Sequence, residues 1–145
     1  VCSSDLTYNV GHADHATAIN QLGVGGWCRA TLGYRLDLKK ASKELQEWVI
    51  SEMDKVAKHV AIAHHLMAAG GDMTKRITEI RMPILIMFGE ESPLAKKEQM
   101  NEMKAKLPNA KLVMFDGYGH GINLLIPDRC VDELQKFFAE HNFAA

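Results

Sequence analysis

The sequence predicts an α/β fold in which a helical region precedes a strand, a helix, a second strand and a final helix. Three observations support this prediction. Residues 13–80 contain helical spacings and almost no strand signal, residues 83–88 and 111–115 are continuous apolar runs typical of buried strands, and a segment with helical spacing follows each run. Because strands that alternate with helices form parallel sheets with right-handed crossovers, we expect the two strands to be parallel.

Within the helical region, residues 41–69 place apolar side chains at spacings of three, four or seven, which predicts one amphipathic stripe. Its members are Leu45, Val49, Met53, Val56, Val60 and Met67. Gly70 and Gly71 end the stripe, and Asp72 can cap the turn that follows. Upstream, the glycines predict bends between short helices. These glycines are Gly23, Gly25, Gly26 and Gly33.

After residue 80 the pattern changes to alternating strands and helices. Gly89 ends the first apolar run, helical spacing resumes over 98–107, and the second run covers 111–115. Pro127 stands at a favoured early position of the last helix. We expect the buried face of that helix to consist of its large apolar residues, Val131, Leu134, Phe137 and Phe138. Since both strands have buried-type composition, each is expected to need further neighbours.

Composition narrows the class of protein. An apolar fraction of 47% and a charged fraction of 24% are ordinary for a soluble globular protein. The net charge of −1 argues against broad attraction to nucleic acid or anionic membrane. No signal peptide and no apolar run near the roughly 20 residues of a membrane span are visible. Three widely spaced cysteines suit reduced thiols, so we expect a cytoplasmic protein without nucleic-acid or membrane partners. The sequence does not indicate an oligomeric state.

The first six residues, VCSSDL, read like the translation of a sequencing adaptor. We therefore expect residues 1–6 to be an artefact and leave them out of the fold prediction, as we would a fusion scar. The alternative is a natural polar N-terminus.

The stretch 111–127, KLVMFDGYGHGINLLIP, carries the clearest chemical signal. A buried strand ends in a glycine-rich loop, and His120 stands between two glycines. Gly117, Gly119 and Gly121 permit tight or positive-φ backbone, which would hold the histidine just beyond the strand. Ligands of open α/β sheets bind beyond the carboxyl ends of strands, and histidine exchanges protons near neutral pH. His120 is therefore predicted to be catalytic; the alternative is a loop histidine with a structural hydrogen bond.

Residues 80–138 resemble the end of an α/β-hydrolase. The run IRMPILIMFG is similar to the family's strand before the acid turn, and LPNAKLVMFDGYGH is similar to the strand and loop that present its catalytic histidine. Residues 13–79 resemble, more loosely, the family's helical cap. The resemblance implies a partial α/β-hydrolase fold, with a helical cap or lid at 7–79 and the C-terminal part of the core at 80–145.

The resemblance also implies that the nucleophile lies elsewhere. The family keeps a G-x-S-x-G elbow before its cap. None of the serines of this chain has that context: they are Ser3, Ser4, Ser42, Ser51 and Ser92. We therefore expect a C-terminal fragment of a longer hydrolase, inactive by itself and prone to aggregate because its sheet edge and helix undersides would be exposed.

This chain differs from the family at the position where the catalytic acid usually stands. An aspartate usually follows the strand-closing glycine by three residues; here that glycine is Gly89 and the position holds Ser92. Serine lacks the negative charge that stabilises an imidazolium, although it can accept the ring N–H. Glu91 is the predicted acid and Glu90 a second candidate; alternatively both are solvated loop carboxylates. The acid can also follow the preceding strand, for which Asp14 is a distant candidate.

Two histidine groups resemble metal sites without matching one. His12, Asp14 and His15 fit no common zinc spacing. His64 and His65 are adjacent on a predicted helix, so their side chains diverge by about 100° and cannot bind one ion together. Solvated or packed roles are expected for these residues, and no metal or cofactor is implied.

The parent protein is accordingly expected to be a soluble hydrolase of an apolar ester, lactone or related carbonyl compound, acting by nucleophile, histidine and acid. Trp27, in the cap, is predicted to line the substrate pocket. One alternative is a dehalogenase-type enzyme with an aspartate nucleophile. Another is a non-catalytic interaction protein in which Ser92 marks a decayed triad.

Overall fold

The computed structural model describes residues 9–70 and 74–142, with side chains described for 9–67 and 74–142. The chain groups into two units, Val1–Asp72 and Met73–Ala145, called below the helical unit and the α/β unit. Residues 74–79, assigned from sequence to the helical region, group with the second unit; the division into cap and core stays a prediction. The suspected artefact at 1–6 and the turn at Asp72 lie outside the described residues.

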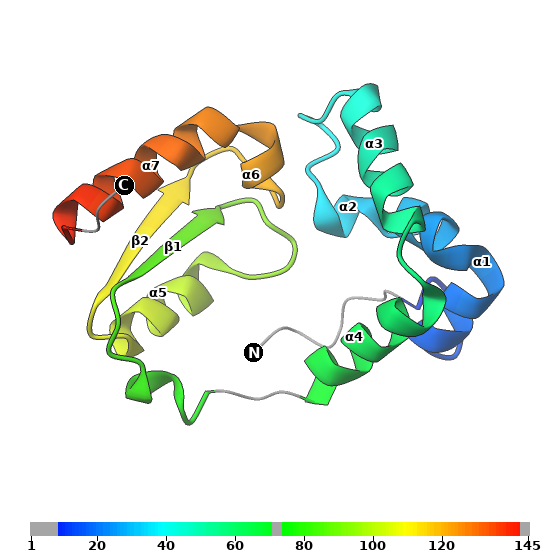
Figure 1. Ribbon diagram of the computed structural model, residues 1–145, viewed down its shortest axis with the longest axis horizontal. Helices are drawn as coiled ribbons and strands as arrows, with labels where there is room; N and C mark the ends of the chain where they lie inside the picture. Colours follow the sequence, from blue (N-terminus) through cyan, green and yellow to red (C-terminus); the bar gives the residue numbers. More distant parts are fainter. Residues whose placement is uncertain (1–8, 71–73, 143–145) are drawn as a thin grey trace. The chain divides into compact units, whose positions relative to one another are not determined.

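The helical unit confirms the predicted helical region. Its elements are α1 (His15–Ala30), α2 (Leu32–Arg35), α3 (Lys43–Asp54) and α4 (Lys58–Gly70) (Figure 1). Side-chain caps begin two of these helices. Asp14 accepts a hydrogen bond from the Thr17 N–H at the start of α1, and Ser42 accepts one from the Leu45 N–H at the start of α3.

A bend interrupts α1 at Gly23, whose φ of 74° confirms one of the predicted breaks. The prediction is wrong for Gly25 and Gly26, which are helical, and for Gly33, which lies inside α2. A glycine is needed at position 25 because of packing rather than a bend. Its N–H donates to Asp54 Oδ1 over 2.9 Å, and a Cβ on Gly25 would stand 2.6 Å from that oxygen. The end of α3 thereby supplies an acceptor to the part of α1 that restarts after the bend.

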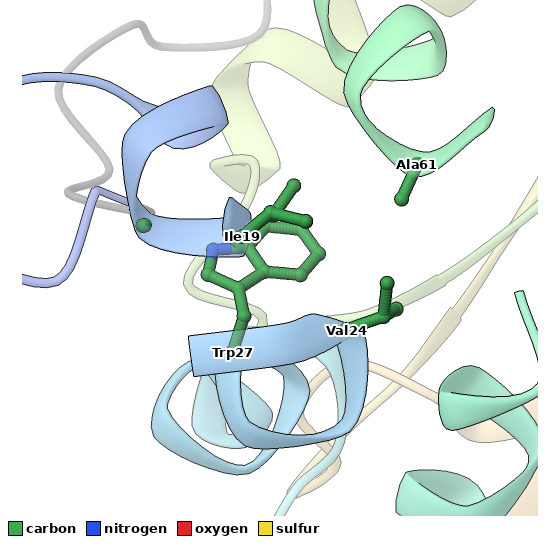
Figure 2. Packing of buried hydrophobic residues seen from close by; sticks show 5 residues of the cluster. Ile19, Val24, Trp27 and Ala61 are labelled. Atoms are coloured by element: carbon green, nitrogen blue, oxygen red, sulfur yellow. The ribbon is translucent and has the colours of Figure 1, made fainter. Parts of the chain in front are cut away.

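The single stripe predicted over residues 41–69 is correct only in part: Met53 and Val56 pack against the core of the helical unit, but the stripe does not continue into α4. The chain leaves the helical state after Asp54 and re-enters it at Lys58, which resets the phase of the apolar positions. As a result Met67 is 71% exposed and Val60 is also exposed. Ala61 packs into the core instead, together with residues of α1 (Figure 2); the buried cluster is Ala18, Ile19, Val24, Trp27 and Ala61.

The α/β unit contains the predicted strand, helix, strand and helix. Its elements are η1 (Ile77–Glu79), β1 (Ile84–Gly89), α5 (Lys97–Lys106), β2 (Ala110–Phe115), α6 (Ile122–Leu125) and α7 (Pro127–Glu140). The strands pair in parallel with Ile84 opposite Ala110 and Gly89 opposite Phe115, which confirms the predicted topology. Helices α5 and α7 lie on opposite sides of this sheet (Figure 1). Among the described residues, no helix combines the length and apolar character needed to cross a membrane.

The predicted buried face of α7 is only partly correct. Phe137 is buried, at 5% exposure, and Cys130, which the prediction omitted, is buried beside it. Phe138 is 39% exposed, and Val131 and Leu134 are exposed as well. The reason is geometric: neighbouring strands lie about 4.8 Å apart, so two strands cover one side of a helix and leave the adjoining side open.

Candidate active site

The candidate site lies where the two strands end. Because β1 and β2 are parallel and in register from Ile84↔Ala110 to Gly89↔Phe115, their carboxyl ends meet at one edge of the sheet. The loop 90–96 leaves β1 and the loop 116–121 leaves β2 at this edge. Every residue predicted for the acid turn and for the histidine loop therefore belongs to two adjacent loops of the α/β unit.

Backbone contacts fix the two loops against each other. A Cβ placed on Gly89 would stand 2.6 Å from the Tyr118 carbonyl oxygen and closer still to that of Gly119. Only glycine allows this approach. The N–H of Glu91 donates to the Tyr118 carbonyl over 2.9 Å. The separation of the loops is thus set by main-chain atoms, independently of the side chains they carry.

The histidine loop takes its shape from two left-handed glycines. Gly117 has a φ of 71° and Gly121 a φ of 86°, as predicted, and Gly121 immediately precedes α6. Gly119 is not a positive-φ residue; its role is the close approach to Gly89. Between these glycines the side chain of His120 is exposed at the strand edge.

His120 faces Ser92. The Oγ of Ser92 lies 3.4 Å from Nδ1 of His120, within hydrogen-bond reach at the long end of the range. Ser92 is itself held in place, since its N–H donates to the Gly89 carbonyl over 3.0 Å and its Oγ accepts the N–H of Leu94 over 3.3 Å. The serine at the usual acid position therefore occupies the place at the ring where an acid would act.

The two glutamates have different surroundings. Both carboxylate oxygens of Glu90 lie near Lys97 Nζ, at 3.1 and 3.3 Å, so that carboxylate is paired. The side chain of Glu91 is exposed, while its backbone is tied to the histidine loop. The catalytic role of Glu91 stays a prediction. Asp14, the distant candidate, caps α1; the hydrogen bond from Thr17 lowers the pKa of its carboxyl.

A buried apolar cluster packs against the histidine loop. Phe115, Ile122 and Cys130 form a buried cluster, with partly buried residues around them that include Tyr118. The guanidinium of Arg129 lies 5.1 Å from the Phe115 ring centroid and 5.6 Å from that of Tyr118. Arg129 was not among the residues predicted for the site, because its contact with these two rings depends on the fold. Burial raises the pKa of the Cys130 thiol, which makes it a poor nucleophile.

Trp27 is a core residue of the helical unit, with 1% of its surface exposed. The Arg35 guanidinium stands 4.3 Å from its ring centroid, and the His65 ring meets it edge-on at 4.8 Å. The His15 ring lies 5.1 Å from that of His65. A packed role for His65 is therefore confirmed. Among the described residues no three His, Cys, Asp or Glu side chains gather as a metal site would require.

An open hollow of about 420 Å³ lies on the helical unit between α1 and α3. Arg29 and Glu47, which line the hollow, form a bidentate ion pair with N–O distances of 2.6 and 2.7 Å. This pair lowers the pKa of the Glu47 carboxyl. Asp54 contributes a third charged group. This polar lining differs from the apolar pocket that the sequence analysis expected in this region.

Comparison with known proteins agrees with this geometry. The model of a hydrolase family described as TAP-like protein matches residues 54–142, which is more than half of the chain. The chain belongs to the TAP-like α/β-hydrolases. The family prediction is thereby confirmed, and the histidine loop and both strands lie within the matched region.

Similar proteins are hydrolases of the same superfamily. The AB hydrolase superfamily protein YisY of Bacillus subtilis (strain 168) is 29% identical over 92 residues, which are 63% of this chain and 34% of that protein. A thermophilic esterase from Thermogutta terrifontis matches with a TM-score of 0.73 and 20% identity over 86% of this chain. The esterase EaEST from Exiguobacterium antarcticum matches with a TM-score of 0.72 and 17% identity over 84%.

The two structural matches confirm the fold prediction: this member of the TAP-like family has part of an α/β-hydrolase fold. It spans 47% of each of these esterases and about a third of the curated relative.

Proposed function

We propose that His120 is the general base of an esterase-type hydrolase that acts on an ester, a lactone or a related carbonyl compound. The observation that carries the proposal is the placement of His120 in a rigid glycine loop at the carboxyl ends of β1 and β2, with Nδ1 turned to Ser92. The names of similar structures, which are esterases, favour this chemistry over other hydrolase reactions.

In the proposed reaction a serine outside residues 1–145 attacks the carbonyl carbon. Nε2 of His120 takes the hydroxyl proton as the new C–O bond forms, and then gives it to the alcohol oxygen as the ester C–O bond breaks. Water releases the acyl group by the same two proton transfers. Glu91 supplies negative charge near the imidazolium. No cofactor takes part.

The proposal is tested with two proteins: the 145-residue chain and the longer enzyme encoded by the genomic reading frame around residues 7–145. Hydrolysis of p-nitrophenyl butyrate is expected from the longer enzyme alone. His120→Ala should lower its kcat by on the order of 10⁶, because a triad histidine acts together with its serine. His59→Ala, which alters an exposed histidine on α4, is the control and should leave kcat unchanged.

Two results would contradict the proposal. One is esterase activity in the 145-residue chain that His120→Ala abolishes, because residues 1–145 would then contain the nucleophile. The other is a longer enzyme whose activity survives the loss of His120. A longer protein with no hydrolase activity would instead support the alternative that Ser92 favours, a non-catalytic interaction protein.

Glu91 is tested by its own pair of variants. Glu91→Gln removes the exposed carboxylate and should lower kcat by about tenfold or more, since the imidazolium loses a stabilising charge. Glu90→Gln removes a carboxylate that Lys97 already pairs, and should change kcat little. Equal effects of the two variants would exclude a specific role for Glu91.

A further inference from the structure

The group found at Nδ1 of His120 is a hydroxyl rather than a carboxylate. We infer that Ser92 is a positioning residue: its Oγ accepts the Nδ1–H of His120 and favours the tautomer in which Nε2 carries no proton and can accept one. The inference rests on the proposed function for its catalytic meaning, whereas the hydrogen bond itself can be tested without any reaction.

The role of Ser92 depends on the position of a single proton on the His120 ring. Neutral imidazole carries one N–H, on either nitrogen, and a general base needs that proton on Nδ1 so that Nε2 can accept another. A hydroxyl that accepts at Nδ1 favours this tautomer, whereas one that donates to Nδ1 favours Nε2–H, and NMR distinguishes the two tautomers. Holding the wrong tautomer, with the geometry otherwise intact, costs a triad enzyme about 10⁴ in kcat. A hydroxyl that accepts this proton therefore still favours the required tautomer, as the usual acid does. It does not supply the negative charge that stabilises the imidazolium.

Ser92 has the hydrogen-bonding capacity for this role. A hydroxyl oxygen has two lone pairs, and the Leu94 N–H at 3.3 Å uses one of them. The second lone pair can accept from His120. The Ser92 N–H donates to the Gly89 carbonyl, which fixes the backbone at residue 92. The 3.4 Å separation is the loose contact seen in catalytic groups without substrate, where hydrogen bonds tighten in the reacting complex.

The surrounding backbone makes variants at position 92 informative. The contact of Gly89 with Gly119 and the hydrogen bond from Glu91 to Tyr118 hold the loops together through main-chain atoms. None of these contacts uses the Ser92 hydroxyl. Removing it should therefore leave the loops in place and remove only the contact of Ser92 with the His120 ring.

The first test is ¹⁵N NMR of the histidine side chains in the 145-residue chain, at a pH where imidazole is neutral. Wild type and Ser92→Thr, which keeps the hydroxyl, should show His120 mainly as the Nδ1–H tautomer. Ser92→Ala should shift it to Nε2–H, while the exposed His59 stays the same in all three proteins. His120 mainly as Nε2–H in wild type, or the same tautomer in Ser92→Ala, would overturn the inference.

The second test uses the kinetics of the longer enzyme and stands even if the short chain does not fold. Ser92→Ala should lower kcat about 100-fold with little change in KM, Ser92→Thr should retain activity, and Ser92→Asp should raise kcat by restoring the charge. Ser92→Ala with wild-type kcat, where His120→Ala is inactive, would refute the inference alone. An active His120→Ala enzyme would refute the proposed function, and the NMR result would still decide whether Ser92 sets the tautomer.

Discussion

Gly89 at the end of β1 lies directly against the carbonyl of Gly119 in the histidine loop. A Cβ on Gly89 would collide with backbone oxygens, that of Tyr118 among them at 2.6 Å, and backbone cannot rotate aside as a flexible side chain can. Gly89→Ala should therefore force the loop and the strand end apart. We expect a loss of about 1–3 kcal/mol in the free energy of unfolding, measured by urea denaturation.

Gly26→Ala is the matched control for this substitution. Gly26 is helical, and a Cβ there would meet only the Leu22 Cβ at 3.4 Å, an ordinary contact. The variant should be neutral or more stable by up to about 1 kcal/mol, because alanine favours the helix. If both variants unfold at the same urea concentration, the close approach of Gly89 does not constrain the fold.

The two tryptophans of the helical unit should respond differently to truncation. Trp27 is 1% exposed and packs in the core, so Trp27→Ala should cost about 3–5 kcal/mol. Trp48 on α3 is 51% exposed, and Trp48→Ala should cost less than about 1 kcal/mol. Thermal unfolding followed by far-UV circular dichroism measures both. A small cost at Trp27, with reduced substrate affinity in the longer enzyme, would favour the binding role over the packing role.

His65 should make the stability depend on pH. Burial, and then the positive charges of His15, Arg35 and His64, lower its pKa from 6.5 to about 4. The unfolded chain therefore binds the proton first, and stability falls as the pH drops from about 6.5 to about 4. The loss should be on the order of 1–2 kcal/mol, reduced from the full shift because the ring is only half-buried.

Urea denaturation at several pH values measures this dependence. His65→Gln should flatten the stability profile in that window. His59→Gln, on the exposed side of the same helix, should leave it unchanged. An equal slope in wild type and His65→Gln would assign the acid sensitivity to other groups.

Two adjacent phenylalanines on α7 differ in exposure, so substitutions at these positions should affect stability and solubility differently. Phe137 is 5% exposed, and Phe137→Ala should destabilise the α/β unit by about 3–5 kcal/mol. Phe138 is 39% exposed beside Val131 and Leu134, so Phe138→Lys should cost little and reduce self-association of the 145-residue chain. Light scattering measures the association. Unchanged scattering in Phe138→Lys would show that this face does not mediate it.

Local signals in the sequence predicted much of the α/β unit. Apolar runs bounded by glycine or proline identified β1 and β2, and Pro127 marked the first residue of α7. Chain order then dictated parallel pairing, since a helix separates the strands. Ser92, three residues after Gly89, is the side chain found at Nδ1 of His120, whereas Glu91 was the residue predicted as the acid.

Contacts between distant residues explain what the sequence did not predict. The break between α3 and α4 contains no glycine or proline, so helical spacing appeared to run through it. The packing of His65 against His15 and Trp27 joins segments far apart in the chain. Gly119 was interpreted through its backbone freedom, whereas its actual constraint is the neighbouring strand, which no local pattern reveals.

The order β1, α5, β2 also has a kinetic consequence. The two strands that pair among the described residues are separated only by one short helix and its loops, so the entropy lost on closing them is modest. Units dominated by such nearby pairings reach their native arrangement quickly. Because Gly89 at the end of β1 lies against the Gly119 carbonyl, we expect the loop that carries His120 to take its shape early, when these two strands pair.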